Sequence, residues 1–229
     1  MGSKNKLKRF KENESFANVI QPTREELLTG SFSHKGAWQY YFGNANPIVL
    51  ELGCGKGEYT IGLGRKNPNT NYIGIDIKGA RFWRGAKTAL EEDLQNVAFV
   101  RAQIELLEYA FAAKEVSEIW ITFPDPQYKF KRVHHRLTNP TFLRSYRNVL
   151  KSDGCVHLKT DSAFLHGYTL GILDGWGISP KMAHHDVYQY VHAPKEVISI
   201  QTFYEQQYRQ KNIPITYLKF SFYTDVPTT

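Results

Sequence analysis

Residues 47–57 read PIVLELGCGKG, and this stretch decides the fold. Its apolar run, Ile48–Leu52, stops at a glycine, which predicts a short buried strand. Three glycines then alternate with other residues: Gly53, Gly55 and Gly57. Glycines let the backbone turn tightly and come close to a ligand. The next segment, Glu58–Lys66, has the length of a helix, so we expect a strand, a tight loop and a helix in succession.

The same alternation continues outward from this unit. Four further apolar runs predict buried strands: Tyr72–Asp76, Val97–Val100, Ile119–Phe123 and Cys155–Thr160. Helix-length segments lie between or after them: Lys78–Leu94, Glu105–Ala113, Pro140–Leu150 and Ser162–Leu173. Strands and helices alternating at this spacing predict βαβ units in a parallel, doubly wound sheet. Right-handed crossovers would place helices on both faces of that sheet.

The two ends of the chain have different patterns. The last third predicts an extended segment near His185–Val191, a helix over Glu196–Gln210 and a strand over Tyr217–Tyr223. These complete a doubly wound, seven-stranded, mostly parallel α/β sheet with a hairpin-like end. Residues 1–30 are polar and charged, with no sustained apolar period apart from one short helix near Arg24–Leu28. We therefore expect a basic, flexible arm over residues 1–30 and a single domain over residues 31–229.

Composition excludes several classes of protein. With 229 residues, 41% hydrophobic and 22% charged, the chain is long enough to bury a full core without disulfides. No apolar run approaches the length of a membrane span, and the start, MGSKNKLKRF, lacks the apolar region of a signal peptide. The two cysteines, Cys54 and Cys155, are expected to be reduced thiols in a cytoplasmic protein. Nothing in the pattern decides between a monomer and a homodimer.

The positive charge is concentrated in two places. The chain has a formal net charge of +7. Between Pro126 and Ser152 there is no acidic residue, and the cations are Lys129, Lys131, Arg132, Arg136, Arg144, Arg147 and Lys151. A second group precedes Glu12: Lys4, Lys6, Lys8, Arg9 and Lys11. A basic block on a mildly acidic body favours a polyanionic partner, although a solvated charged face would have the same composition.

The glycine loop indicates the kind of ligand. Its spacing is G-x-G-x-G, and Glu58 stands where the dinucleotide fingerprint needs another glycine. Glu51 precedes the loop, where a pyrophosphate would be repelled and a cationic or amino-acid portion would be favoured. Asp76 ends the second strand, and a carboxylate there can accept hydrogen bonds from ribose hydroxyls. This constellation resembles the class I S-adenosylmethionine-dependent methyltransferases, which have a Rossmann-like sheet; a turn that merely needs glycines is the alternative.

A second motif follows the fourth predicted strand. The segment FPDPQYK, residues 123–129, places Asp125 between two prolines at the carboxyl end of a central strand, where open α/β sheets bind ligands. The basic run follows at once, so Lys131, Arg132 and Arg136 are predicted to contact nucleic-acid phosphates. This segment resembles the signature F-P/S-D-P-W-x-K of the bacterial tRNA (guanine-N7-)-methyltransferases, the TrmB family.

Two further motifs extend this resemblance over residues 30–225. Thr160-Asp161 ends the fifth strand, and Thr202-Phe203-Tyr204-Glu205 matches the family's T-x-F/Y-E element. There are departures: Gln127 replaces the family's tryptophan, Arg132 stands at a usual histidine, and His135-Arg136 replaces an Arg-Arg pair. Gln103 replaces a common acid, but its carbonyl can still accept a hydrogen bond from an adenine amino group.

The resemblance implies transfer of a methyl group from S-adenosyl-L-methionine to N7 of a guanine in the variable loop of tRNA. It implies cofactor contacts at Glu51, Gly53, Gly55, Gly57, Asp76, Gln103 and Asp125. It implies substrate contacts at Lys129, Asp161, Thr202 and Glu205. The guanine becomes cationic as the bond forms, so a nearby carboxylate would favour the transition state, and Asp125 is our catalytic candidate.

Each assignment has a structural alternative. Asp125 can be a turn-forming acid, Asp161 can cap a helix, and Thr202 with Glu205 can form an ordinary capping box. Two other functions also remain open. One is another RNA or DNA base methyltransferase, such as an adenine-N6 enzyme, although Asp125-Pro126-Gln127-Tyr128 lacks the second proline of that motif. The other is a non-catalytic basic RNA-binding module on the same fold. No histidine or cysteine cluster has zinc-like spacing, so we expect no metal.

Overall fold

The computed structural model describes residues 3–222, and side chains from residue 5 onward. Within that range the strands form one eight-stranded sheet with the order β1-β4-β3-β2-β5-β6-β8-β7. The strands are β1 (Val19–Ile20), β2 (Ile48–Leu52), β3 (Asn71–Ile75), β4 (Val97–Val100), β5 (Val116–Thr122), β6 (Leu150–Thr160), β7 (Met182–His184) and β8 (Thr216–Phe220). Strands β1 to β6 run parallel to one another, whereas β8 is antiparallel to both β6 and β7. The expected doubly wound, mostly parallel sheet is confirmed, with β1 as an additional strand.

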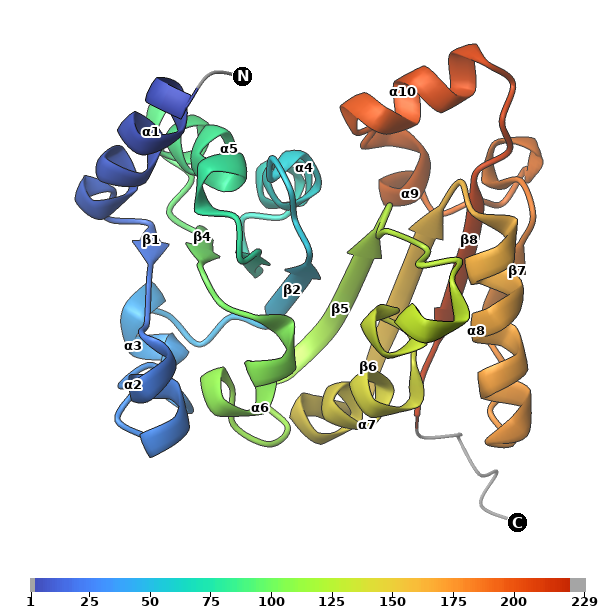
Figure 1. The fold of residues 1–229 in the computed structure, drawn as a ribbon, viewed down its shortest axis with the longest axis horizontal. Helices are drawn as coiled ribbons and strands as arrows, with labels where there is room; N and C mark the ends of the chain where they lie inside the picture. Colours follow the sequence, from blue (N-terminus) through green and yellow to red (C-terminus); the bar gives the residue numbers. More distant parts are fainter. Residues whose placement is uncertain (1–2, 223–229) are drawn as a thin grey trace.

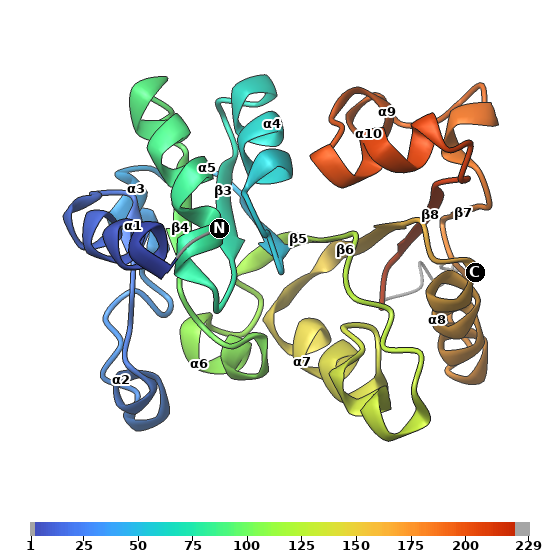
Figure 2. The same ribbon diagram turned by 45° about the horizontal axis from the view of Figure 1, so that its top comes forward.

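Helices cover both faces of the sheet (Figures 1 and 2). The helices are α1 (Ser3–Ser15), α2 (Arg24–Thr29), α3 (Trp38–Phe42), α4 (Glu58–Lys66), α5 (Gly79–Glu91), α6 (Leu107–Ala110), α7 (Pro140–Val149), α8 (Ala163–Gly175), α9 (Lys195–Ser199) and α10 (Phe203–Gln210). Three short 3₁₀ turns accompany them within the described residues: η1 (Ile104–Leu106), η2 (Phe130–His135) and η3 (Val187–Gln189). No helix among these residues is long and apolar enough to cross a membrane.

Alternation along the strands divides the core into two layers. In β2, Leu50 and Leu52 face one layer, whereas Val49 faces the other. The first layer is completed by α2, α3, α6, α7 and α8, and the second by α4, α5 and α9. Each central strand is therefore buried on both sides, which explains the unbroken apolar runs in the sequence.

The N-terminal segment differs from the expected flexible arm. Helix α1 packs on α5, where Asn13 Nδ2 donates to the Gly79 carbonyl at 2.9 Å and Trp83 Nε1 donates to Glu12 at 2.6 Å. Both views place α1 against α5 (Figures 1 and 2). Strand β1 then pairs with β4 as the sheet's edge. A two-residue strand and a polar helix have no distinctive apolar period, so the sequence pattern did not indicate them.

Element boundaries also differ in the last third. The predicted helix over 196–210 is two helices, because Thr202 caps the start of α10 and the chain turns between α9 and α10. The extended segment was expected near His185–Val191, but the strand in this region is β7, which ends at His184. The 3₁₀ turn η3 follows it, and Asp186 caps the start of that turn. The final strand pairs antiparallel as expected, but Tyr223 lies outside the described residues.

Candidate functional site

A cavity of about 1000 Å³ opens at the carboxyl ends of β2, β3 and β5. Its lining includes Glu51, Gly53 and Gly55 from β2 and the glycine loop, and Thr122 and Phe123 from the end of β5. Helix α10 contributes Thr202 and Tyr204 from the opposite half of the sheet. The carboxyl edge of a parallel sheet is where α/β proteins bind ligands, so this cavity is the candidate site.

The glycine loop takes a conformation that requires glycine. Gly53, Gly55 and Gly57 have φ angles of 72°, 57° and 74°, which are costly for residues with a side chain. At Gly57 a Cβ atom would also lie 2.6 Å from the Phe99 ring, so the start of α4 could not approach β4. The prediction that these glycines form a tight turn is borne out by these φ angles, and their contact with a cofactor stays a prediction.

Glu51 lies buried beneath the loop and is only 3% exposed. Its carboxylate accepts hydrogen bonds from the Thr122 hydroxyl at 2.6 Å, from the Thr60 backbone N–H at 2.8 Å and from the Thr60 hydroxyl. Burial raises the pKa of Glu51 to about 7, although these hydrogen bonds oppose the shift. The cavity therefore has a carboxylate in its wall whose charge a cationic ligand would stabilise.

The other predicted cofactor residues lie in different surroundings. The Asp76 carboxylate accepts the backbone N–H of Gly55 at 3.0 Å and of Lys78 at 2.8 Å, so it ties the glycine loop to the β3–α5 turn. Each oxygen retains a lone pair for a ligand hydroxyl. Gln103 is exposed and is not part of the cavity lining; its Oε1 accepts from Arg24 at 2.7 Å. The predicted adenine contact of Gln103 stays a prediction, because its carbonyl oxygen can accept a second hydrogen bond.

Asp125 is exposed on the loop that follows β5. Its Oδ1 accepts the backbone N–H of Gln127 at 3.0 Å, and both Phe123 and Gln127 have a φ of 48°. The Phe123 N–H donates to the Lys159 carbonyl at 2.8 Å, which fixes the start of the loop to β6. A turn-forming role and a reactive role are therefore compatible at Asp125, because one carboxylate oxygen is left without such a bond.

Arg136 does not lie where the sequence analysis predicted. It is 5% exposed, and its guanidinium donates to the Gln127 carbonyl at 3.2 and 3.1 Å. The guanidinium carbon also lies 4.7 Å and 4.5 Å from the ring centroids of Phe164 and Tyr168. Arg136 therefore holds the Asp125 loop onto α8, which corrects its assignment as a phosphate contact. Lys129, Lys131 and Arg132 are exposed on and before η2.

The predicted substrate residues separate into two kinds. Asp161 is partly buried, and Ser162 rather than Asp161 caps α8 by accepting the Leu165 N–H at 3.2 Å. Thr202 lines the cavity and caps α10. Its capping partner Glu205 is fully buried. The capping-box alternative for Thr202 and Glu205 is therefore present in the structure.

Glu205 belongs to a buried ion pair that sequence reasoning missed. Lys159 Nζ lies 2.6 and 2.8 Å from the two carboxylate oxygens and also donates to the Ile200 carbonyl at 3.1 Å. The Tyr188 hydroxyl donates to the same carboxylate at 2.7 Å. With its oxygens used in this way, Glu205 is a positioning group for α10, which differs from the predicted direct contact with guanine. The sequence feature that could have indicated this ion pair is Lys159 itself, a lysine within a predicted buried strand.

Sequence reasoning also missed the wall that α1 and α5 contribute to the cavity. Arg9 and Phe10 of α1 line it, together with Arg81, Trp83 and Arg84 of α5. Lys56 and Arg101 add further positive charge at its edge. Apart from Glu51 and Glu58, the charged residues of the lining are basic, which suits a polyanion at the mouth of the cavity.

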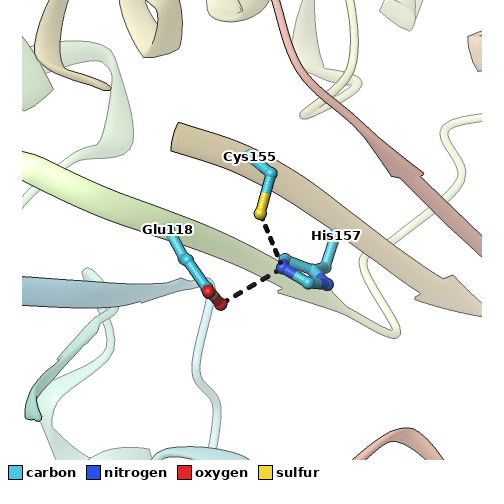
Figure 3. Close-up of side chains that lie close together, drawn as sticks. All are labelled: Glu118, Cys155 and His157. Carbon is cyan, nitrogen blue, oxygen red and sulfur yellow. Dashed lines mark hydrogen bonds and ion pairs between the residues drawn. The ribbon is translucent and has the colours of Figure 1, made fainter. Parts of the chain in front are cut away.

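One group of possible metal ligands occurs in the described part of the chain. Glu118 on β5 and Cys155 and His157 on β6 lie side by side, and His157 Nε2 is 3.2 Å from both the Glu118 carboxylate and the Cys155 thiol (Figure 3). The other ring nitrogen, Nδ1, lies 2.8 Å from the Tyr217 hydroxyl, and the Trp120 ring stacks on the imidazole. These contacts account for the cluster as a hydrogen-bonded network between strands.

The fold and this site define a class of protein, the α/β methyltransferases. The family described as "Putative methyltransferase" matches residues 45–218. Among solved structures, the 16S rRNA methyltransferase KamB has a TM-score of 0.63 at 14% identity, covering 82% of this chain and 94% of that chain. A 16S rRNA (adenine(1408)-N(1))-methyltransferase from Catenulisporales acidiphilia has a TM-score of 0.56 at 14% identity, covering 81% and 92%. These two likenesses concern the fold.

Sequence relatives identify the particular family. The tRNA (guanine-N(7)-)-methyltransferase of Christiangramia forsetii is 68% identical over 96% of this chain and 99% of its own length. The proteins of that name from Bacteroides thetaiotaomicron and Listeria monocytogenes are 45% and 36% identical, over 95% and 82% of this chain and 85% and 86% of their own lengths. The chain belongs to the bacterial tRNA (guanine-N(7)-)-methyltransferase family.

Proposed function

We propose that this protein transfers a methyl group from S-adenosyl-L-methionine to N7 of a guanine in the variable loop of tRNA. The observation that carries the proposal is the placement of Asp125. Its exposed carboxylate stands on a loop fixed at the carboxyl end of β5, two residues beyond Phe123 in the wall of the cavity that holds Glu51 and the glycine loop. The 68% identical relative of the same family name supports the same reaction.

The cavity fits the cofactor in size and in donor set. Its volume of about 1000 Å³ accommodates a nucleoside joined to an amino acid. Glu51 would face the cationic part, the glycine loop would allow close approach of the backbone, and Asp76 would accept from the ribose hydroxyls. When bound, the cofactor would supply a sulfonium methyl group whose carbon a nucleophile can attack, with S-adenosylhomocysteine as the leaving group.

The residues of this chain need to position the target guanine and to stabilise the charge that develops on it. N7 of guanine carries a free lone pair, so no group has to remove a proton before attack. The largest requirement is to hold the base in line with the methyl group. Positive charge then develops on the guanine ring, and the Asp125 carboxylate stabilises that charge more in the transition state than in the ground state. Lys129, Asp161 and Thr202 are the proposed contacts to the target nucleotide.

The exposed cations supply the contact with tRNA phosphates. Lys131 and Arg132 project from η2, next to the Asp125 loop, and Lys129 directly precedes that turn. The Cys54 thiol takes no part in our mechanism, because burial raises its pKa well above the usual value and keeps it protonated. Deprotonation of the protein is not required at any step.

The test is methylation of an unmodified tRNA transcript with labelled S-adenosyl-L-methionine, followed by borohydride and aniline cleavage at 7-methylguanosine. We expect label incorporation and strand scission at one variable-loop guanine. The variant Asp125→Asn keeps an oxygen acceptor for the Gln127 N–H but loses the charge, so its rate should fall by about 10²–10³-fold with folding unchanged. Asp174→Asn, at an exposed site on α8, is the matched control. Incorporation without scission would assign the reaction to another atom.

A further inference from the structure

Helix α10 presents to the cavity an aromatic ring, Tyr204, that lies at the surface and has an edge-on contact with Phe203, with ring centroids 5.8 Å apart. Tyr204 is 51% exposed, yet it lines the cavity together with Phe123. A large ring that remains half exposed contributes little to the core. The backbone beneath it is firmly held, because the capping box and the Lys159–Glu205 pair fix the first turn of α10. The ring is therefore mounted on a rigid support and is free to contact a ligand.

Other aromatic rings lie around the same point. Tyr208, one turn further along α10, stacks on Phe123 with ring centroids 6.2 Å apart and an interplanar angle of 29°. Burial raises the pKa of Tyr208, and the nearby Asp161, Tyr204 and Tyr128 raise it further. Tyr208, Asp161, Tyr204 and Tyr128 therefore lie near one another, although they come from α10, the turn after β6 and the Asp125 loop.

Asp161 supplies a carboxylate near these rings. Burial raises the pKa of Asp161, and a hydrogen bond from its own backbone N–H opposes the shift. Because the side chain is only partly buried, its oxygens remain open to N–H donors from a ligand. A flat apolar face beside such a carboxylate is complementary to a base that carries two N–H donors on one edge, as guanine does at N1 and N2.

We propose that Tyr204 is the stacking surface for the target guanine, with Phe123 and Tyr208 completing an aromatic pocket beside Asp161, a substrate contact of the proposed function. This inference rests on the proposed function. Enzymes that modify a base draw it out of its stack and hold it against aromatic side chains. The electron-rich face of tyrosine also attracts a cation, so it binds the guanine more strongly as methylation makes the ring positive.

The neighbouring aromatic residue has a different place. Phe203 precedes Tyr204 on the same helix and is 46% exposed, but it is absent from the cavity lining. Its ring lies under Lys56 Nζ at 4.2 Å, and its backbone N–H donates to Glu58 at 3.2 Å. Phe203 thus joins α10 to the glycine loop, which leaves Tyr204 as the residue of this turn that faces the ligand.

The test compares Tyr204→Leu, Tyr204→Phe and, as a control, Tyr109→Leu, at an exposed tyrosine on α6 that is 41% exposed. Single-turnover methylation is measured at saturating enzyme and cofactor. We expect Tyr204→Leu to lower the rate by about tenfold to a hundredfold, and the other two variants to stay within about twofold of the wild type. The affinity for tRNA should change by less than about threefold, because phosphate contacts dominate it.

Two further measurements separate stacking from other roles. Equilibrium dialysis with S-adenosyl-L-methionine should give the wild-type affinity for Tyr204→Leu; a loss of cofactor affinity with a normal rate at saturation would overturn the proposal. A transcript with 2-aminopurine at the target position should fluoresce more brightly on Tyr204→Leu than on the wild type. A Tyr204→Leu enzyme with the wild-type rate would refute the stacking role alone. A wild-type protein that methylates no guanine N7 would refute the proposed function and the guanine pocket together.

Discussion

Glu51 is the residue whose chemistry depends most on its surroundings. Its carboxyl group is hydrogen-bonded within the protein, and burial raises its pKa to about 7. Because the folded-state pKa lies above the ordinary value, Glu51 is largely protonated at pH 6 and largely ionised at pH 8. The folded protein therefore binds this proton more tightly than the unfolded chain, and Glu51 ionisation lowers stability as the pH rises towards about 7.

The same ionisation should control cofactor binding. S-adenosyl-L-methionine carries positive charge, so it prefers the ionised form of Glu51. We expect the dissociation constant to be about tenfold larger at pH 6 than at pH 8, as the ionised fraction falls. Isothermal titration calorimetry between pH 6 and pH 8 measures this dissociation constant. Glu51→Gln should bind more weakly at pH 8 and show a much flatter pH profile; an unchanged profile in this variant would assign the titration to another group.

At the scale of elements, the buried pair of Lys159 and Glu205 joins β6 to α10. Burial lowers the pKa of Lys159 to about 8, and the Glu205 charge opposes that shift. Lys159 also donates to the carbonyls of Val197 and Ile200, so it holds the turn between α9 and α10. The position of Thr202 and Tyr204 in the cavity therefore depends on a lysine that does not itself line the cavity.

Breaking this pair should cost far more than breaking an exposed one. We expect Lys159→Met to lower the free energy of unfolding by about 3–5 kcal/mol, because it leaves the Glu205 carboxylate buried without its partner. The comparison is Arg65→Met, which breaks the exposed Arg65–Glu92 pair at 2.6 Å and should cost about 0–1 kcal/mol. Urea unfolding measures the free energy of unfolding of both variants. The double variant Lys159→Met/Glu205→Gln should lose less than the sum of the two single losses, and strict additivity would argue against the coupling.

At the scale of the whole molecule, the surplus of positive charge has a definite location. Lys131 and Arg132 are exposed beside the Asp125 loop, whereas Lys35 and Lys114 are exposed near the amino-terminal ends of the central strands. The two pairs carry the same charge and differ in their position relative to the cavity. A general attraction between a basic protein and RNA would depend equally on both.

We expect Lys131→Gln/Arg132→Gln to weaken tRNA binding and to reduce the slope of log affinity against log salt by about two. Lys35→Gln/Lys114→Gln should leave the slope close to the wild-type value. Filter binding over a range of salt concentrations measures both double variants. Equal slopes for the two would mean that tRNA does not lie over η2, and that the charge there is only a solvated surface.

The sequence by itself determined the α/β sheet and the ligand-binding edge. Apolar runs such as Ile48–Leu52, the glycines after them and the alternation with helices are local patterns, and local patterns report strands, turns and their order. The motifs around Asp125, Asp161 and Thr202 likewise identified the family, because each is a short contiguous stretch. The edge of the sheet at which they meet follows from the parallel arrangement of the strands.

Only the tertiary structure decided which of these side chains are available to a ligand. Arg136 is a cation in a basic run, yet its carbonyl partners and the rings of α8 bury it. Glu205 matches a substrate motif, yet a lysine 46 residues away occupies its carboxylate. Gln103 accepts a hydrogen bond from Arg24 of α2, and α1 forms part of the cavity wall. Burial and pairing between distant residues depend on how the helices pack, and residue spacing within one stretch carries no record of that packing.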